Sequence, residues 1–451
     1  MSGVVAILFT ATSFNLSAQE QNSTTISNPW TLEQCINYAM EHNIQLQQRK
    51  LTKEQSTQDV AQNKAGLLPS LSFSSNHNVA WRPWSESFTN LSGGTMTQTS
   101  SEVNYNGSYG LNANWTVWNG GRNYKNVKRS ELAEEMSEYD IEETANSIQE
   151  QILQYYVQIL YQAEAVNVCK EVLAASKMQR DRGQVMVDVG SLARVDLAQL
   201  ESQVSQDEYT LVNNETQLAN YKLKLKQLLE LVNTEDFDIV IPTIDDSRIM
   251  ATLPSKSEVW SAAYTSRPEI RNNQLSIQSA DLDIDIARRG YLPSISLSAG
   301  IGTSSSSGQS TSFPEQWKTN LSNSIGLTLS IPIFDNRQNK TNVAKARLSK
   351  MSSELTLLNT EKELYSQIET YWLNARNAQQ QYQYAKKNTD AMQASYDLVS
   401  EQFKVGLKNI VELTTGKNNL LQAQQQLLQS KYTALLNISM LRFYAGERIQ
   451  L

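Results

Sequence analysis

An internal repeat constrains the fold of this 451-residue chain more strongly than any local pattern does. Residues 66–74 contain a Gly-x-Leu-Pro-Ser run followed by alternating apolar and serine residues, and residues 290–298 repeat it. Three further matches link Gly110 with Gly326, Tyr155 with Tyr371, and Val189 with Val405. The chain therefore contains two copies of one unit. We place the copies at residues 30–231 and 257–446, joined by a linker at 232–256 where prolines interrupt the helical pattern.

Each copy is predicted to contain a long helical hairpin. Residues 124–187 lack proline, and their apolar side chains recur at a spacing of three or four, which predicts one helix about 96 Å long. A glycine-containing break at 189–191 precedes a second helix to about residue 231, and a similar break lies at 405–407. We expect another helix over about 257–290. These lengths fit a tube of helices that continues a barrel of strands.

Four segments are predicted to be strands, at about 70–81, 107–118, 294–302 and 323–333, because apolar and small polar residues alternate along them. The polar positions hold Ser, Thr, Asn and Gly with almost no charge, and the runs approach the roughly 9–11 residues of a tilted membrane-spanning strand. A water-soluble sandwich is the alternative, although it would normally carry Lys or Glu on its outer face. Since the smallest membrane barrels have about eight strands, several chains would have to share one barrel.

The connections at 82–106 and 302–322 are rich in Ser, Thr, Gly and Asn, and we predict that they are outer loops. Tryptophans in and near the strands are candidates for a membrane-interface belt, although each could equally be a packing residue. These residues are Trp81, Trp84, Trp115, Trp118 and Trp317.

Composition excludes several classes of function. The chain has 39 Lys+Arg against 46 Asp+Glu, a formal charge of −7, so it has no basic excess for nucleic acid. Two cysteines and two histidines are too few for a zinc site or a disulfide framework. No acid/base or nucleophilic cluster is found, so we expect neither an enzyme nor a cofactor or metal. The mean hydropathy of −0.46 argues against a bundle of membrane-spanning helices.

The amino terminus carries a short apolar run at residues 4–9, followed by small and polar residues up to Ala18. This pattern is typical of a secretory signal peptide, which we predict at residues 1–18, although the usual basic region is missing. A frayed apolar terminus is the alternative.

Taken in order, these features resemble the TolC-like outer-membrane efflux family of channel-tunnels. The segment 30–46 is similar to the family's opening motif, and Gly-x-Leu-Pro-Ser precedes the strands of each copy. Residues 118–122 and 334–337 are similar to the motifs that follow the strands, and both Val-Gly reversals are present. The resemblance spans roughly residues 30–446 and occurs twice with matching spacing.

The resemblance implies an α+β membrane protein of the bacterial outer membrane that extends into the periplasm. It implies a homotrimer in which four strands per chain complete a 12-strand barrel in outer-membrane lipid, above a periplasmic α-helical tunnel. Such a channel is the passive exit duct of a tripartite efflux or type I secretion system. It opens at its periplasmic tip on docking to an adaptor and an inner-membrane pump. The alternative is a soluble coiled-coil scaffold. A lining of Asn, Gln, Ser and Thr would pass drugs, metal ions or polypeptides alike.

The resemblance also implies roles for residues near the two reversals. Glu412 would form an acidic ring at the lumen constriction, and Lys408 would tie the closed tip to a carboxylate such as Asp196. Thr415 stands where the family can carry a second carboxylate, and Phe403 stands at an aromatic position without a phenol hydroxyl. The adaptor-docking tip would comprise Val189, Gly190, Val405, Gly406 and Leu407. Solvated helix surface and simple turn geometry are the alternatives for these two groups.

Overall fold

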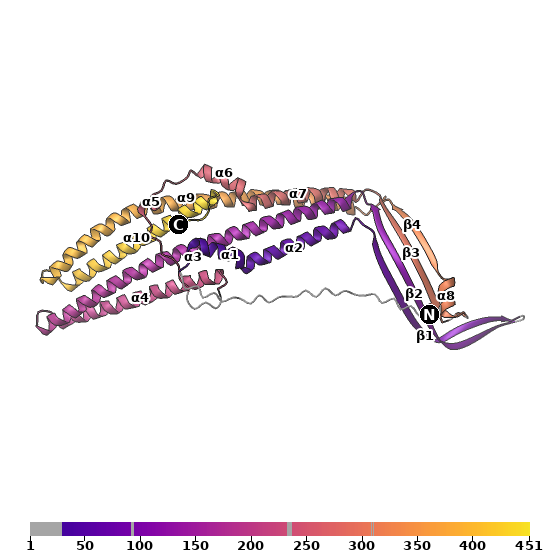
Figure 1. Ribbon diagram of the computed structural model, residues 1–451, viewed down its shortest axis with the longest axis horizontal. Coiled ribbons are helices and arrows are strands. Elements are labelled where there is room, and N and C mark those ends of the chain that lie inside the picture. The colour runs from indigo at the N-terminus through magenta and orange to yellow at the C-terminus, as the bar shows by residue number, and fades with distance from the viewer. Residues whose placement is uncertain (1–28, 92–93, 232–236, 308, 310) are drawn as a thin grey trace.

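The computed structural model describes residues 29–91, 94–231, 237–307, 309 and 311–451. Helices run side by side along the long axis of the molecule, and a sheet continues from one end of them at an angle (Figure 1). The predicted signal segment at 1–18 and part of the predicted linker lie outside the described residues. In the described part of the chain, no helix combines the length and the apolar character needed to cross a membrane.

The two long hairpins have equal dimensions. Helices α3 (Arg122–Asp188) and α9 (Gln338–Lys404) each have 67 residues, which corresponds to about 100 Å. They reverse into α4 (Arg194–Leu228) and α10 (Ile410–Tyr444), each of 35 residues. The equal lengths are the structural counterpart of the sequence repeat.

The shorter helices also follow the repeat. Helices α1 (Leu32–His42) and α2 (Ile44–Ala65) have 11 and 22 residues, as do α6 (Lys256–Ser266) and α7 (Pro268–Arg289). A four-residue helix, α5 (Asp246–Ile249), lies in the segment between the copies. The prediction of one continuous helix over 257–290 was therefore wrong. Pro268 begins α7, and it holds the preceding residue in an extended conformation that ends α6.

The sheet is antiparallel throughout and has the order β1-β2-β3-β4. Its strands are β1 (Ser70–Leu91), β2 (Gly94–Trp118), β3 (Ser294–Ser306) and β4 (Ser322–Ser330). The four junctions that join the strands to α2, α3, α7 and α9 lie at the same end of the sheet (Figure 1).

Two predictions about the strand ends were wrong. The segment 82–106 is not a loop, because β1 and β2 stay paired as far as Leu91 and Gly94, with an irregularity between Arg82 and Ser85. Strand β4 ends at Ser330 rather than at 333, and the proline at position 332 has no N–H to continue a ladder. The connection at 302–322 contains a short helix, α8 (Phe313–Thr319).

The hydrophobic core lies where the helices of both copies meet, away from the sheet. One cluster joins α1, α3, α4 and α10 around Tyr156, which is 2% exposed. A second cluster joins α6, α9 and α10 around Ile368. Trp30 and Ile239 form a parallel bridge beside the first cluster, and the Tyr156 hydroxyl donates a 2.7 Å hydrogen bond to the carbonyl of Val240. The middle of the helical body is therefore its most tightly packed zone.

Candidate functional site at the sheet and the hairpin tips

The pairing register of the sheet separates apolar from polar side chains. Along one row, Phe73 pairs with Leu111, which pairs with Ile301. The next row on the opposite face contains Ser72, Asn112, Gly300 and Ser324. The apolar residues are exposed in the single chain, with Phe73 at 69% and Ile325 at 84%. Where all four strands pair, one face is thus apolar and largely exposed, whereas the other is polar and uncharged.

Aromatic side chains gather near both ends of the apolar face. The Trp115 indole donates a 2.8 Å hydrogen bond to the carbonyl of Leu67 beside the helices. At the far end, α8 lies against the sheet, where Trp317 makes an edge contact with Tyr109 at 5.8 Å between ring centroids. Gln316 of α8 is 1% exposed and is hydrogen-bonded to Ser306. Of the predicted interface tryptophans, Trp115, Trp118 and Trp317 therefore lie on elements that frame the apolar face, as does Trp81 on β1.

The two hairpin tips share one backbone geometry. Gly190 and Gly406 have φ of +76° and +80°, and the amide after each donates to the carbonyl five residues earlier. This 6→1 hydrogen bond with a left-handed glycine is a Schellman cap, which ends the helix and reverses the chain. Val189, Val405 and Leu407 are between 70% and 73% exposed. Each tip therefore presents apolar side chains beside a fixed turn.

The charged groups of the second tip contact one another within the chain. Lys408 Nζ lies 2.5 Å from Glu412 Oε1, and Asn409 caps α10 by accepting a 2.9 Å hydrogen bond from the Glu412 amide. The hydrogen bond from Lys408 holds the pKa of Glu412 below its ordinary value, and the Asn409 amide adds to this effect. Asp196 lies half-buried in the first turn of α4. Within one chain, Lys408 therefore pairs with Glu412 rather than with Asp196.

Phe403 does not project from the tip but packs between the hairpins. It is 7% exposed and forms an apolar cluster with Leu200, Ile410 and Leu413. Gly183 of α3 makes room for this cluster, because a Cβ there would lie 2.5 Å from Leu200 Cδ1. Thr415, in contrast, is exposed.

A buried polar cluster lies farther from the tips than this apolar one, and the sequence analysis did not predict it. Lys417 Nζ of α10 lies 2.6 Å from Asp207 Oδ2 of α4 and 2.7 Å from Ser176 Oγ of α3. Ser176 donates a 2.6 Å hydrogen bond to the same carboxylate oxygen, and the three residues are at most 5% exposed. Burial lowers the pKa of Lys417 below its ordinary value, and the Asp207 carboxylate opposes that shift. A signal existed, since Leu413 and Leu420 flank Lys417 on the buried face of the helix.

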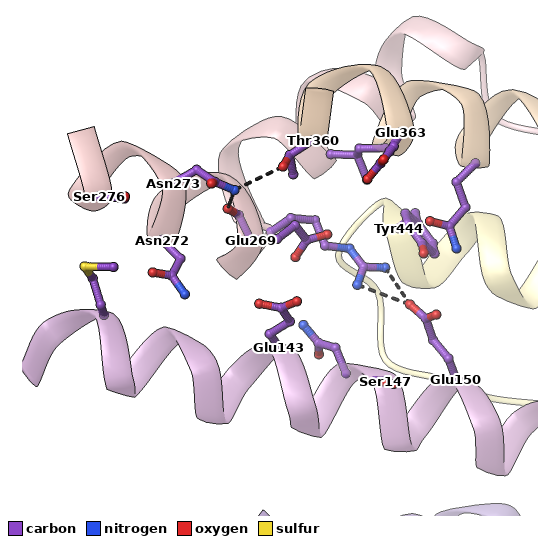
Figure 2. A pocket seen from close by; sticks show the side chains of 15 residues that line it. Glu143, Ser147, Glu150, Glu269, Asn272, Asn273, Ser276, Thr360, Glu363 and Tyr444 are labelled. Atoms are coloured by element: carbon purple, nitrogen blue, oxygen red, sulfur yellow. Dashed lines mark hydrogen bonds and ion pairs between the residues drawn. The ribbon is translucent and has the colours of Figure 1, made fainter. Parts of the chain in front are cut away.

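An acidic cavity of about 510 Å³ lies between α3, α7 and α9 (Figure 2). Glu143, Glu150, Glu269 and Glu363 line it, and the guanidinium of Arg267 lies 3.3 Å from Glu150. Arg267 is 6% exposed and stacks 3.7 Å from the ring centroid of Tyr444. Burial raises the pKa of Glu150 above its ordinary value, although Arg267 opposes that shift. This ion pair joins the two copies near the middle of the helical body.

Comparison with known proteins adds three findings. The family model described as outer membrane efflux protein matches residues 35–230 and 259–447. The outer membrane protein TolC of Salmonella enteritidis is 23% identical over 381 residues, covering 75% of this chain and 73% of that protein. The alkaline protease secretion protein AprF of Pseudomonas aeruginosa is 20% identical over 411 residues, covering 90% and 82%.

Solved structures are similar over nearly the whole chain. A CusC structure gives a TM-score of 0.76 at 17% identity and covers 92% of this chain and 91% of that one. The CmeC outer membrane channel of Campylobacter jejuni gives 0.73 at 20% identity and covers 92% and 86%. These likenesses establish the fold.

Proposed function

The chain belongs to the outer membrane efflux protein family, and on this premise we propose that it is the passive exit duct of a tripartite efflux or secretion system. The resemblance drawn from the sequence motifs is confirmed by the family match in both copies. The protein is accordingly an outer-membrane channel with a helical body that extends into the periplasm. The family consists of transport ducts rather than enzymes.

The separation of the sheet into an apolar face and a polar face is the observation that carries this proposal. Its apolar face matches lipid, and its face of Ser, Asn and Gly matches a water-filled lumen. Strands β1 and β4 are edges in the single chain, and exposed edges promote pairing with another chain. Three copies joined edge to edge would give twelve strands, which is within the range of closed membrane barrels. The helices would then continue the barrel as a tunnel, because the strand junctions with α2, α3, α7 and α9 all lie at one end.

The hairpin tips supply the gate and the docking surface in this proposal. Three copies of Glu412 would form a ring that attracts cations, with Asp196 and Lys408 as further gate residues. Val189, Gly190, Val405, Gly406 and Leu407 would contact a periplasmic adaptor, which connects the duct to an inner-membrane pump. Support for docking comes from the exposed apolar side chains beside two rigid turns. Relatives are named for protease secretion and for toxin and drug export, so both proteins and small molecules suit the proposal as cargo.

A photo-crosslinking residue at Leu407 tests the docking surface. Leu51 of α2 is a matched control, because it is also a largely exposed leucine but lies far from the tip. After irradiation of living cells, mass spectrometry should identify a periplasmic adaptor attached at position 407 and none at position 51. Adducts with unrelated proteins only, or extraction of the protein without detergent, would refute the duct and favour a soluble scaffold.

A further inference from the structure

The buried cluster of Ser176, Asp207 and Lys417 lies a short distance along the hairpins from their tips. Ser176 is 14 residues before Gly190, and Asp207 is 13 residues after the first residue of α4, so both lie about 20 Å from the first reversal. Lys417 is seven residues into α10, about 10 Å from its start. The cluster therefore links both helices of the first hairpin to the returning helix of the second.

The cluster differs in kind from the apolar contacts nearer the tip. There, Leu200 of the first hairpin meets Phe403 and Leu413 of the second through apolar surfaces, which have no preferred direction. In the buried cluster, Asp207 Oδ2 accepts from Lys417 and Ser176, while Oδ1 accepts a 2.9 Å hydrogen bond from Gln203. The bonds from Lys417 and Ser176 cross between helices, so they form at only one register of the helices. Sliding α10 along α4 would leave two buried charges apart, which is strongly unfavourable.

We propose that Lys417 is a positioning residue of the gate, held by Asp207 and Ser176 so that α10 keeps one register against the first hairpin. Glu412 lies five residues nearer the tip on the same helix, so the cluster sets the height of the acidic ring.

Tip-ward of this joint, the hairpins meet through the apolar cluster and through a 2.7 Å hydrogen bond from Gln179 to the Tyr396 hydroxyl. Neither contact involves a charge, so the hairpins can separate there during opening. The inference rests on the proposed channel function and identifies the residues that position its gate.

Single-channel recording on the purified full-length protein in planar bilayers tests this role. Lys417→Met should raise the conductance or the open fraction several-fold over the unsubstituted protein, because α10 loses its fixed register. Lys431→Met is the matched control. Lys431 also joins α10 to α3, through a 2.8 Å contact with Glu164, but it lies 14 residues farther from the tip. It should leave gating unchanged.

A double variant separates positioning from general damage to the fold. Asp207→Leu with Lys417→Met removes both charges, so no buried charge is left unpaired and assembly should return to normal. If the cluster positions the gate, this double variant still shows raised conductance, because the directional bonds are gone. Gating restored to that of the unsubstituted protein would overturn the inference, as would Lys431→Met acting like Lys417→Met. An unsubstituted protein that forms no pore would instead refute the channel function, and this inference with it.

Discussion

Arginine placed on either face of β2 tests which face of the sheet meets lipid. Leu111 and Asn112 are neighbours on an inner strand and are both exposed, yet they lie on opposite faces. Leu111 pairs with apolar residues on both sides, whereas Asn112 pairs with a serine and a glycine. Leu111→Arg would place a charge in the lipid, and Asn112→Arg would place the same charge in the lumen.

The expected cost follows from depth in the membrane. Leu111 is two residues from Ala113, the middle of the apolar run, which is about 5 Å of depth for a strand tilted by about 45°. An arginine costs about 2–4 kcal/mol at the midplane of a membrane barrel and about 0–1 kcal/mol at its edges. We therefore expect about 2 kcal/mol per chain at Leu111, or about 6 kcal/mol for three chains. The lumen position should cost less than about 1 kcal/mol.

Urea unfolding of the protein refolded into lipid vesicles measures this difference. Leu111→Ala is the control for lost apolar area, so the charge term is the difference between the arginine and alanine variants. Equal destabilisation by the two arginine variants would refute the assignment of the faces. A larger cost at Asn112 would mean that the faces are reversed.

Three further expectations concern the helical body. The lowered pKa of Glu412 keeps its carboxylate ionised to lower pH, so the midpoint at which cation selectivity, measured by reversal potential, is lost should lie below pH 4.5, the ordinary pKa. Glu412→Gln should remove the selectivity at every pH. Gly190→Ala should cost about 1 kcal/mol of unfolding free energy, from backbone strain alone, because its Cβ would meet no atom within 4 Å. Gly183→Ala should cost at most about 2 kcal/mol, because overpacking of about 1–3 kcal/mol is offset by about 1 kcal/mol of helix propensity. Arg267→Met should cost about 3–5 kcal/mol, because it leaves Glu150 buried without its counter-charge.

Each of these expectations has a contrary outcome. Selectivity lost well above pH 4.5 would mean that Lys408 does not hold the Glu412 carboxylate. Stabilisation by the full propensity gain of about 1 kcal/mol at Gly183 would contradict the overpacking argument, and an unchanged unfolding free energy at Gly190 would contradict the strain argument. Arg129→Met is the control for Arg267, because its ion pair with Asp283 is 47% and 43% exposed and should contribute less than about 1 kcal/mol. Equal costs for the two arginines would contradict the role of burial.

The large elements could be predicted because each has a local signal that repeats. The spacing of apolar residues predicts the hairpins, and the glycine after each valine predicts their reversals. The alternation of apolar and polar residues predicts the starts of the strands at Ser70 and Ser294. The extension of β1 and β2 through 82–106 could not be predicted in this way, since those residues lack regular alternation. There the two strands continue by backbone pairing with each other, and every residue except Pro83 carries the same backbone donor and acceptor.

The buried cluster shows a sharper limit of sequence reasoning. Asp207 follows Ser176 by 31 residues, and Lys417 follows Asp207 by 210, so no window of sequence contains the group. The position of Lys417 between two leucines of a buried stripe does indicate that its charge needs a partner, because an unpaired buried charge is too costly to keep. Which carboxylate supplies that partner depends on how three helices from two copies of the repeat, α3, α4 and α10, lie against one another. The position of Lys417 therefore indicates only that its charge needs a partner, and the packing of the hairpins identifies that partner.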